Sequence, residues 1–267
     1  MSETKYFTVP IPMLQGMLTG QKSIKDVMVD VMDYSIYYHA KHSVYGENGE
    51  MGGYNSMRTQ VKAASNFLNI QTYLERTLSN GEKLYKGFQN KPYSSIAAQI
   101  MWDYYNNAKT SHQVALFCAF CAVRSIIGKA EYRKTNKGLI LARMFSYNDA
   151  KDFKNSIPER FHRNQGKVMF ERYTKELEVR EKYAKRYHMD KLLTDLELSW
   201  GLKRYSDHVR GMFLSFSLDY KKLAVVNENS KKKYKLNELK EAKKQATLAV
   251  KNSSKTRGQL TTPLKHL

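Results

Sequence analysis

Two pairs of side chains in this sequence have types and spacings that suit a metal ion. Cys118 and Cys121 form a Cys-x-x-Cys pair, and His39 and His42 have two residues between them. Zinc sites need a second pair of ligands at suitable spacing, and none follows the cysteines. Nickases of the relaxase type need two histidines that flank a single apolar residue, so the histidines also miss their pattern. Because the cysteines lie in an apolar segment, we interpret them as core thiols and expect no metal and no cofactor.

Other patterns that carry chemistry are weak or missing. Asp26, Asp30 and Asp33 recur along one expected helix and could seed a metal site, but a solvated acidic face explains them more simply. The glycine-rich segment 41–56 lacks the lysine and hydroxyl that end a phosphate-binding loop, and no GxSxG or HExxH motif is present. We therefore predict no catalytic residue and expect a protein that is not an enzyme.

The charge of the chain indicates a different function. Forty-five Lys and Arg oppose 25 Asp and Glu in 267 residues, which gives a net charge of +20 and a pI near 9.7. Residues 1–150 hold 17 basic and 11 acidic side chains, whereas residues 151–267 hold 28 and 14. Such self-repulsion is typical of proteins whose partner is a polyanion, because phosphates neutralise the excess. We therefore expect a nucleic acid as the partner, bound mainly by the second half.

The segment 139–153 has the residue order of a helix-turn-helix. In that motif a small residue lets two helices pack closely, an apolar residue fills the seam, and the chain then turns back to the core. These positions are filled in turn by Ala142, Phe145, Ser146 and Tyr147. Asn148 would cap a second helix that begins at Asp149. The alternative is an ordinary amphipathic helix that ends in a polar turn.

A similar order occurs in the segment 59–85. Its small, seam, turn and returning residues are Ala64, Ser65, Leu68, Asn69 and Ile70. Asparagine tolerates the left-handed conformation that such a turn requires. The Asn80–Gly81 pair suits a tight turn beyond the second helix. One unbroken helix over 57–78 is the alternative, since Leu74 arrives one position early for the pattern.

Hydrophobic periodicity predicts the helices and strands that precede the motif at 139–153. A short strand or extended arm over 6–14 is expected because two prolines exclude a helix interior, and apolar spacing predicts a helix over about 24–40. Residues 111–127 are apolar nearly all round, which is typical of a buried helix. A short basic strand or loop over 129–134 follows, and Thr135 would cap the next helix.

Beyond the second motif the sequence becomes more basic. Residues 159–170 alternate around a turn and predict a β-hairpin, the wing of a DNA-binding domain, with a plain basic loop as the alternative. Charged helices are expected over 171–198 and a buried strand over 210–218. From residue 228 the sequence is lysine-rich and poor in bulky apolar groups, so it predicts an accessory arm that is disordered or helical.

Together these patterns predict a mainly α protein with small β-hairpins (α+β), made of tandem winged-helix or helix-turn-helix units and a basic C-terminal tail. The units are expected at 1–95 and 96–227, the second with a helical extension, and the tail at 228–267. This layout resembles the plasmid-type replication initiators, which carry two winged-helix domains in one chain. The resemblance covers roughly residues 6–220 and implies binding to repeated duplex DNA sites at a replication origin. The glycine-rich loop and the basic tail depart from it.

On this hypothesis the second helix of each unit enters a major groove, and other basic residues hold phosphates. The expected groove-facing residues are Gln71, Thr72, Glu75 and Arg76 in the first unit and Asn148, Asp149, Lys151 and Lys154 in the second. The expected phosphate-binding residues are Arg133, Lys134 and Lys137, then Arg160, Arg163 and Lys167 in the wing, and Lys231, Lys232 and Lys233 in the tail. Phosphate contacts would supply affinity and a steep salt dependence, and base contacts the choice of sequence.

Two other functions stay open. An RNA-binding ribonucleoprotein subunit would use the many tyrosines beside basic residues to stack on unpaired bases. A nuclease or recombinase would need a site assembled from scattered residues. No apolar run reaches the length of a membrane span, and no secretory signal is visible at the start. We therefore expect a cytoplasmic DNA-binding protein of a plasmid, phage or other mobile element, which contacts no membrane and could form oligomers.

Overall fold

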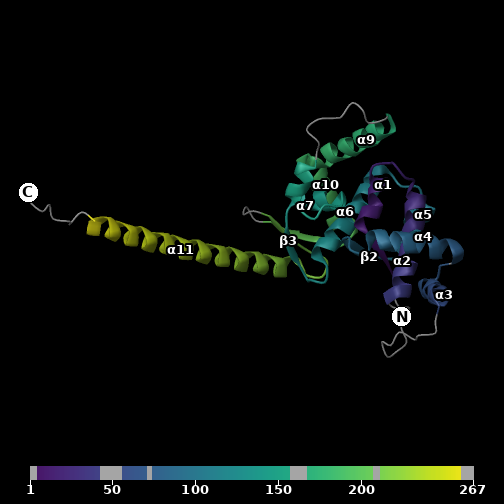
Figure 1. The fold of residues 1–267 in the computed structure, drawn as a ribbon, viewed down its shortest axis with the longest axis horizontal. Helices are drawn as coiled ribbons and strands as arrows, with labels where there is room; N and C mark the ends of the chain where they lie inside the picture. Colours follow the sequence, from purple (N-terminus) through teal and green to yellow (C-terminus); the bar gives the residue numbers. More distant parts are fainter. Residues whose placement is uncertain (1–4, 43–55, 71–73, 157–166, 207–210, 260–267) are drawn as a thin grey trace, which may run out of the picture.

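Helices dominate the computed structural model, which describes residues 5–42, 56–70, 74–156, 167–206 and 211–259. Two small antiparallel sheets accompany them: β1 pairs with β2, and a three-stranded sheet has the order β3-β5-β4. This agrees with the predicted mainly α, α+β class. Figure 1 shows a body that contains the helices α1 to α10 and a long helix, α11, that projects from it.

The first half of the chain is built around the long helix α2. Its elements are, in chain order, β1 (Tyr6–Pro10), η1 (Ile11–Leu14), α1 (Gln15–Leu18), α2 (Ile24–His42), α3 (Met57–Leu68), α4 (Leu74–Phe88), β2 (Tyr93–Ala97) and α5 (Ala98–Asn106). Helix α2 contacts β1, α3, α4 and α5, and its side chains Val31, Tyr34 and Ile36 are buried among them. The predicted helix over about 24–40 and the short strand at the start are confirmed.

A buried carboxylate joins α2 to α4. Asp33 has no exposed surface and accepts hydrogen bonds from Thr77 Oγ1 at 2.9 Å and Asn80 Nδ2 at 3.0 Å, while Arg76 Nη2 lies 3.3 Å away. A buried charge needs such partners, so Asp33 does not belong to a solvated acidic face as expected. The predicted turn at Asn80–Gly81 is also wrong, because both residues lie inside α4. Glycine is required there, since a Cβ at Gly81 would lie 2.8 Å from the Asp33 carbonyl oxygen.

Helix α3 ends at the left-handed turn that was predicted at Asn69. Asn69 adopts the left-handed conformation with a φ of 57°, and Ala64, Leu68 and Ile70 beside it are buried. Left-handed backbone cannot continue an α-helix, so the alternative of one unbroken helix over 57–78 is excluded.

The second half is centred on α6. Its elements are α6 (Ser111–Ile127), β3 (Arg133–Thr135), α7 (Lys137–Met144), α8 (Ala150–Asn155), α9 (Lys167–Ala184), α10 (Arg186–Ser199), β4 (Lys203–Tyr205) and β5 (Met212–Ser215). The predicted buried helix is confirmed, because α6 contacts α1, β2, α7 and α10, and the ring of Phe120 lies 4.4 Å from that of Trp200. One apolar core therefore runs through both halves. The division into units 1–95 and 96–227 stays a prediction, and its boundary falls within β2.

The turn between α7 and α8 occurs where it was predicted, but the residues that cap the two helices differ from those expected. Ser146 has a φ of 72°. Helix α8 is capped by Asp149 and α7 by Asn136, whose side chains accept hydrogen bonds from free backbone amides. The expected caps, Asn148 and Thr135, are each one residue too early. Both true caps have a short side chain with an oxygen that reaches the first turn of the helix, as capping requires.

The predicted wing at 159–170 is wrong in its second run. Residues 167–170, whose alternation predicted a strand, form the start of helix α9, because the helical pattern continues from Lys167 to Ala184. Residues 157–166 lie outside the described residues, and so does the first run of the predicted wing.

A β-hairpin does occur further along the chain. Strands β4 and β5 pair in antiparallel register with Tyr205 opposite Phe213, and β5 also pairs with β3. The four residues of β5 are buried, which confirms the predicted buried strand. Gly211, at the start of β5, has a φ of 109°, and a Cβ there would lie 2.9 Å from the Thr135 carbonyl oxygen. Only glycine fits where this hairpin approaches β3.

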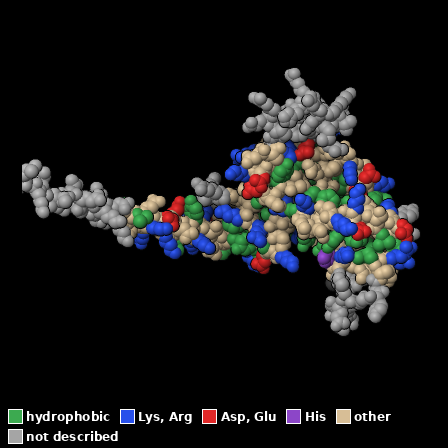
Figure 2. Space-filling model, in the orientation of Figure 1, with side chains coloured by type: hydrophobic (Ala, Val, Ile, Leu, Met, Phe, Trp, Pro, Cys, Tyr) green, Lys and Arg blue, Asp and Glu red, His purple; other side chains and the backbone are tan. Residues whose placement is uncertain are grey.

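The lysine-rich tail is helical as far as Gln259. Helix α11 (Tyr220–Gln259) packs its first turns on β4 and β5, where Leu223 and Asn227 are buried. We call residues 228–259 the arm; its residues 232–249 are all exposed. Figure 1 shows the arm extending away from the body, and Figure 2 shows Lys and Arg side chains along it.

Candidate nucleic-acid interface

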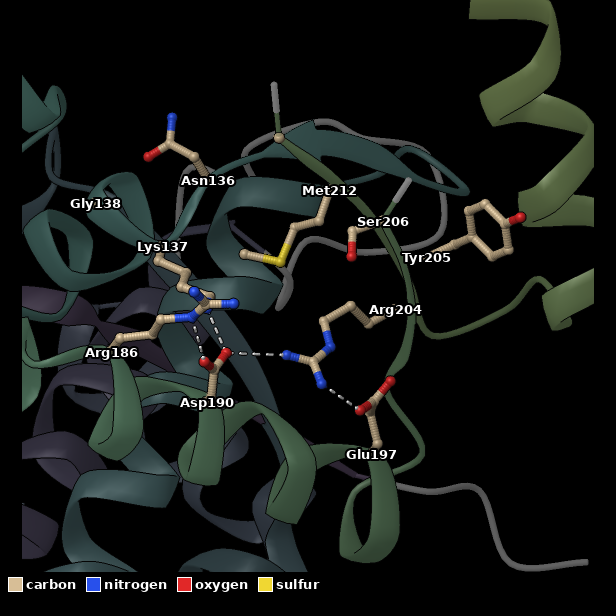
Figure 3. Close-up of a pocket in the computed structure, with 11 residues that line it drawn as sticks. Asn136, Lys137, Gly138, Arg186, Asp190, Glu197, Arg204, Tyr205, Ser206 and Met212 are labelled. Carbon is tan, nitrogen blue, oxygen red and sulfur yellow. Dashed lines mark hydrogen bonds and ion pairs between the residues drawn. The ribbon is translucent and has the colours of Figure 1, made fainter. Parts of the chain in front are cut away.

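A cleft of about 760 Å³ lies where α7, α10 and the β4–β5 hairpin meet (Figure 3). The N-cap and first residues of α7 contribute Asn136, Lys137 and Gly138, and the two strands of the hairpin contribute Arg204 and Met212. The N-terminus of α7 adds partial positive charge on the same side, because its first backbone amides have no partner within the helix. We call this the hairpin cleft.

Three cations from three elements converge on one carboxylate in this cleft. Asp190 of α10 forms ion pairs with Lys137, with Arg186 Nε at 3.4 Å and with Arg204 Nη1 at 3.7 Å. Burial opposes ionisation of Asp190, but the hydrogen bond from Lys137 and the three positive charges outweigh it, so its pKa lies below its usual value. Arg204 Nη2 also donates to Glu197 Oε2 at 3.0 Å. The cleft thus holds three positioned cations against two carboxylates.

The edge of the sheet beside the cleft carries further cations. Arg133 and Lys134 on β3 are exposed, and Lys134 Nζ lies 5.8 Å from the centre of the Phe213 ring. Arg133 and Arg204 flank Leu214 in one row of the sheet, one on each neighbouring strand. The structure therefore brings the predicted phosphate-binding residues Arg133, Lys134 and Lys137 to one region.

The first residues of α10 are exposed beside the same cleft. The Arg186 side chain is 90% exposed, Tyr187 is 72% exposed, and Lys185 precedes them at the helix cap. A cation next to an exposed ring can contact both phosphates and bases. The run KYAKRYH shows this combination in the sequence, but the two helix-turn-helix patterns placed the expected groove-facing residues in other segments.

The remaining predicted residues of the second unit lie on other surfaces. Lys151 and Lys154 are exposed on α8, a helix of six residues that packs on α7. Asn148 lines a separate cleft, and Asp149 is occupied as the cap of α8. The structure does not bring these four residues into the hairpin cleft.

In the first unit, Arg76 contacts the buried Asp33, and Glu75 forms an ion pair with Arg58 at 2.5 Å. Both residues therefore have structural contacts on α4. The other predicted site residues of the first unit and the wing, Gln71, Thr72, Arg160 and Arg163, lie outside the described residues, and the side chain of Lys167 does too.

The predicted tail residues lie at the start of the arm. Lys231 forms an ion pair with Glu228 at 3.0 Å, and Lys232 and Lys233 are exposed. The arm continues α11 beyond the turns that pack on β4 and β5, and Lys and Arg side chains lie along it, away from the body (Figure 2).

Comparison with protein families, with curated proteins and with solved structures finds no match to this chain. Across the ranges that the structure describes, no group of three or more His, Cys, Asp or Glu could hold a metal ion. Cys118 and Cys121 are buried in α6, where burial raises the pKa of both thiols, in keeping with core thiols. None of the described helices combines the length and the apolar surface that crossing a membrane requires.

Proposed function

We propose that this protein binds nucleic acid, with duplex DNA as the favoured partner, through the hairpin cleft and the arm. The observation that carries the proposal is the convergence of Lys137, Arg186 and Arg204 from three elements on one cleft. Cations that are held in place before binding lose little conformational freedom when phosphates arrive, so their contacts contribute more to affinity.

The order of elements supports a winged-helix domain in the second half. Helix α6, strand β3, helix α7, helix α10 and the β4–β5 hairpin follow one another in the order of that fold, with α8 and α9 inserted before α10. The strand order β3-β5-β4 is that of its sheet, in which the hairpin is the wing. On this proposal the wing is the hairpin of β4 and β5 rather than residues 159–170.

On this proposal α10, rather than α8, is the helix that faces the groove. In helix-turn-helix proteins the N-terminal residues of the recognition helix contact base edges, while the preceding helix meets the backbone. Arg186 and Tyr187 occupy the corresponding exposed positions on α10. Lys137, at the first residue of α7, and the sheet residues Arg133 and Lys134 would then hold phosphates.

Matched pairs of substitutions separate the two candidate helices. Lys185→Gln/Arg186→Gln on α10, Lys151→Gln/Lys154→Gln on α8, and Lys62→Gln/Lys83→Gln on α3 and α4 each remove two positive charges from exposed positions. Fluorescence anisotropy with duplex DNA, single-stranded DNA and structured RNA across several salt concentrations gives the affinity and the salt slope of each.

We expect wild type to prefer duplex DNA, and each phosphate contact that is lost to lower the log–log salt slope by about 0.9. The α10 pair should weaken duplex binding more than the other two pairs. Equal losses for all three pairs would contradict the assignment to α10. Preference for RNA or single strands would overturn the duplex proposal and favour the alternative, in which exposed rings such as Tyr187 stack on unpaired bases.

A further inference from the structure

A second cleft, of about 600 Å³, lies where the start of β2, the C-terminal end of α6 and the α7–α8 turn meet. Four cations line it: Lys91 before β2, Arg124 and Lys129 at the end of α6, and Arg143 on α7. Its other lining residues, which include three serines and two asparagines, are neutral. We call this the inter-half cleft, because β2 belongs to the first half and α6 and α7 to the second.

The cations of this cleft have no acidic partner in the part of the chain that the structure describes. The side chains of Lys91, Lys129 and Arg143 form no ion pair or hydrogen bond there, and the Arg124 guanidinium lies over the ring of Phe216, 5.4 Å from its centre. This differs from the hairpin cleft, where every lining cation meets a carboxylate. The nearest acidic residues in sequence are Glu131, two residues after Lys129, and Asp149, six residues after Arg143. Neither lines the cleft, and the Asp149 side chain caps α8 by accepting a hydrogen bond from a backbone amide of that helix.

Arg143 is the cation that a purely structural role explains least. Its Nε atom is buried without a hydrogen-bond partner among the described residues, and burial lowers its pKa. An arginine that only offset the carbonyl end of α7 would donate to those carbonyls, as cations at helix C-termini often do. Arg124 and Lys129 can offset the C-terminal partial charge of α6, but Lys91 and Arg143 come from other elements.

We propose that the inter-half cleft binds a phosphate group, either of a nucleic-acid backbone or of a free nucleotide. The guanidinium of Arg143 is its partly buried ligand, and the exposed Lys91 and Lys129 complete its rim. A volume of about 600 Å³ is within the range of small-ligand sites. With a backbone phosphate as ligand, this inference rests on the proposed nucleic-acid function; with a free nucleotide it does not.

The test uses the full chain and two readouts. Anisotropy with a random-sequence duplex across salt concentrations measures backbone contacts, and calorimetry with a nucleoside triphosphate and with pyrophosphate measures a free ligand. The cleft variants are Lys91→Gln/Lys129→Gln and Arg143→Met. The control, Lys62→Gln/Lys83→Gln, removes the same charge as the lysine pair from exposed positions on α3 and α4. Thermal unfolding of each variant shows that it is folded.

A backbone phosphate is supported if the lysine pair lowers the log–log salt slope by about 2 while the control leaves it unchanged. A free phosphate ligand is supported if the slopes are equal but each cleft variant weakens nucleotide or pyrophosphate binding by about tenfold or more. The inference is overturned if neither readout separates the cleft variants from the control. Wild type that binds no nucleic acid but binds pyrophosphate through these residues would contradict the proposed function and leave the phosphate site standing.

Discussion

The carboxylate of Asp190 on α10 holds the ammonium group of Lys137 at the first residue of α7. The same side chain contacts Arg186 one turn earlier on its own helix and Arg204 on the neighbouring strand. One acidic residue therefore sets the positions of three cations that belong to three elements. Its two roles, neutralising these charges and orienting them, have opposite effects on the binding of an anion and can be separated by substitution.

Replacing Asp190 with asparagine removes the charge and keeps the shape. Because the Asp190 side chain is 36% exposed, we expect the free energy of unfolding to fall by only about 1 kcal/mol or less. On the proposed function, duplex affinity at low salt should rise, since the cleft gains one net positive charge. Urea unfolding and anisotropy measure the two effects. A fall in affinity would mean that the orienting role of Asp190 outweighs its charge.

The pKa of Asp190 also predicts a pH dependence of stability. A carboxyl whose folded pKa lies below its unfolded value, about 3.9 for aspartate, stabilises the fold above that value and loses this contribution as the pH falls through the folded pKa. The stability difference between wild type and Asp190→Asn should therefore be constant near neutral pH and vanish under strongly acidic conditions. Urea unfolding at a series of pH values measures it. A difference that persists at the lowest pH would show that the asparagine perturbs packing rather than charge.

Features that depend on neighbouring residues were predictable from the sequence. The apolar surface of α6 on all sides, the left-handed turn at Asn69 and the turn at Ser146 each follow from the local residue types. Strands of three residues, such as β3 and β4, are harder to predict, because they are too short to show the alternation of apolar and polar residues that indicates a strand. The hairpin was therefore expected in the wrong segment.

Features that depend on distant residues could not be predicted. Asp33 looks like part of a solvated face, because nothing in its surroundings indicates that Thr77 and Asn80 will arrive from α4. The hairpin cleft has the same origin: Lys137, Asp190 and Arg204 are far apart in the chain and meet only through the packing of α7, α10 and β4. The basic residues of β3 were predicted as a group, whereas the role that we propose for α10 rests on the fold.

The contact between α2 and α4 can be tested with two glycines of one helix. At Gly81 a Cβ would lie 2.8 Å from the Asp33 carbonyl oxygen and 2.9 Å from Tyr37 Cβ, so we expect Gly81→Ala to destabilise the protein by about 1–3 kcal/mol. At Gly87 a Cβ would meet nothing within 4 Å, so Gly87→Ala should stabilise it by up to about 1 kcal/mol through helix propensity alone. Urea unfolding compares the two variants. A stabilising Gly81→Ala would contradict the described packing.

Arg143 should lower the stability of the free protein. Its buried Nε has no partner among the described residues, so replacing it with methionine, which keeps much of the apolar stem, is expected to raise the free energy of unfolding by roughly 1 kcal/mol. The exposed Arg58 serves as the control, and Arg58→Met should change stability by less than about 0.5 kcal/mol. Added pyrophosphate should raise the thermal midpoint of wild type and leave that of Arg143→Met unchanged. A destabilised Arg143→Met would mean that the guanidinium is structurally satisfied.

The arm should contribute to binding and not to the stability of the body. Residues 232–249 are exposed, and Asn227 is the last buried side chain of α11 among those that the structure describes, so a chain that ends at Lys231 keeps the buried contacts of α11 with the sheet. This truncation removes ten Lys and Arg and two Glu. We expect the melting temperature of the body to stay the same, while duplex affinity falls and the salt slope decreases, because counterion release scales with the phosphates contacted.

Replacing Lys232, Lys233, Lys235 and Lys240 with glutamine in the full chain should also lower the slope, since it removes charge and keeps the helix. If the truncated chain instead melts at a lower temperature and binds duplex DNA unchanged, the arm is a structural element and the hairpin cleft alone accounts for binding.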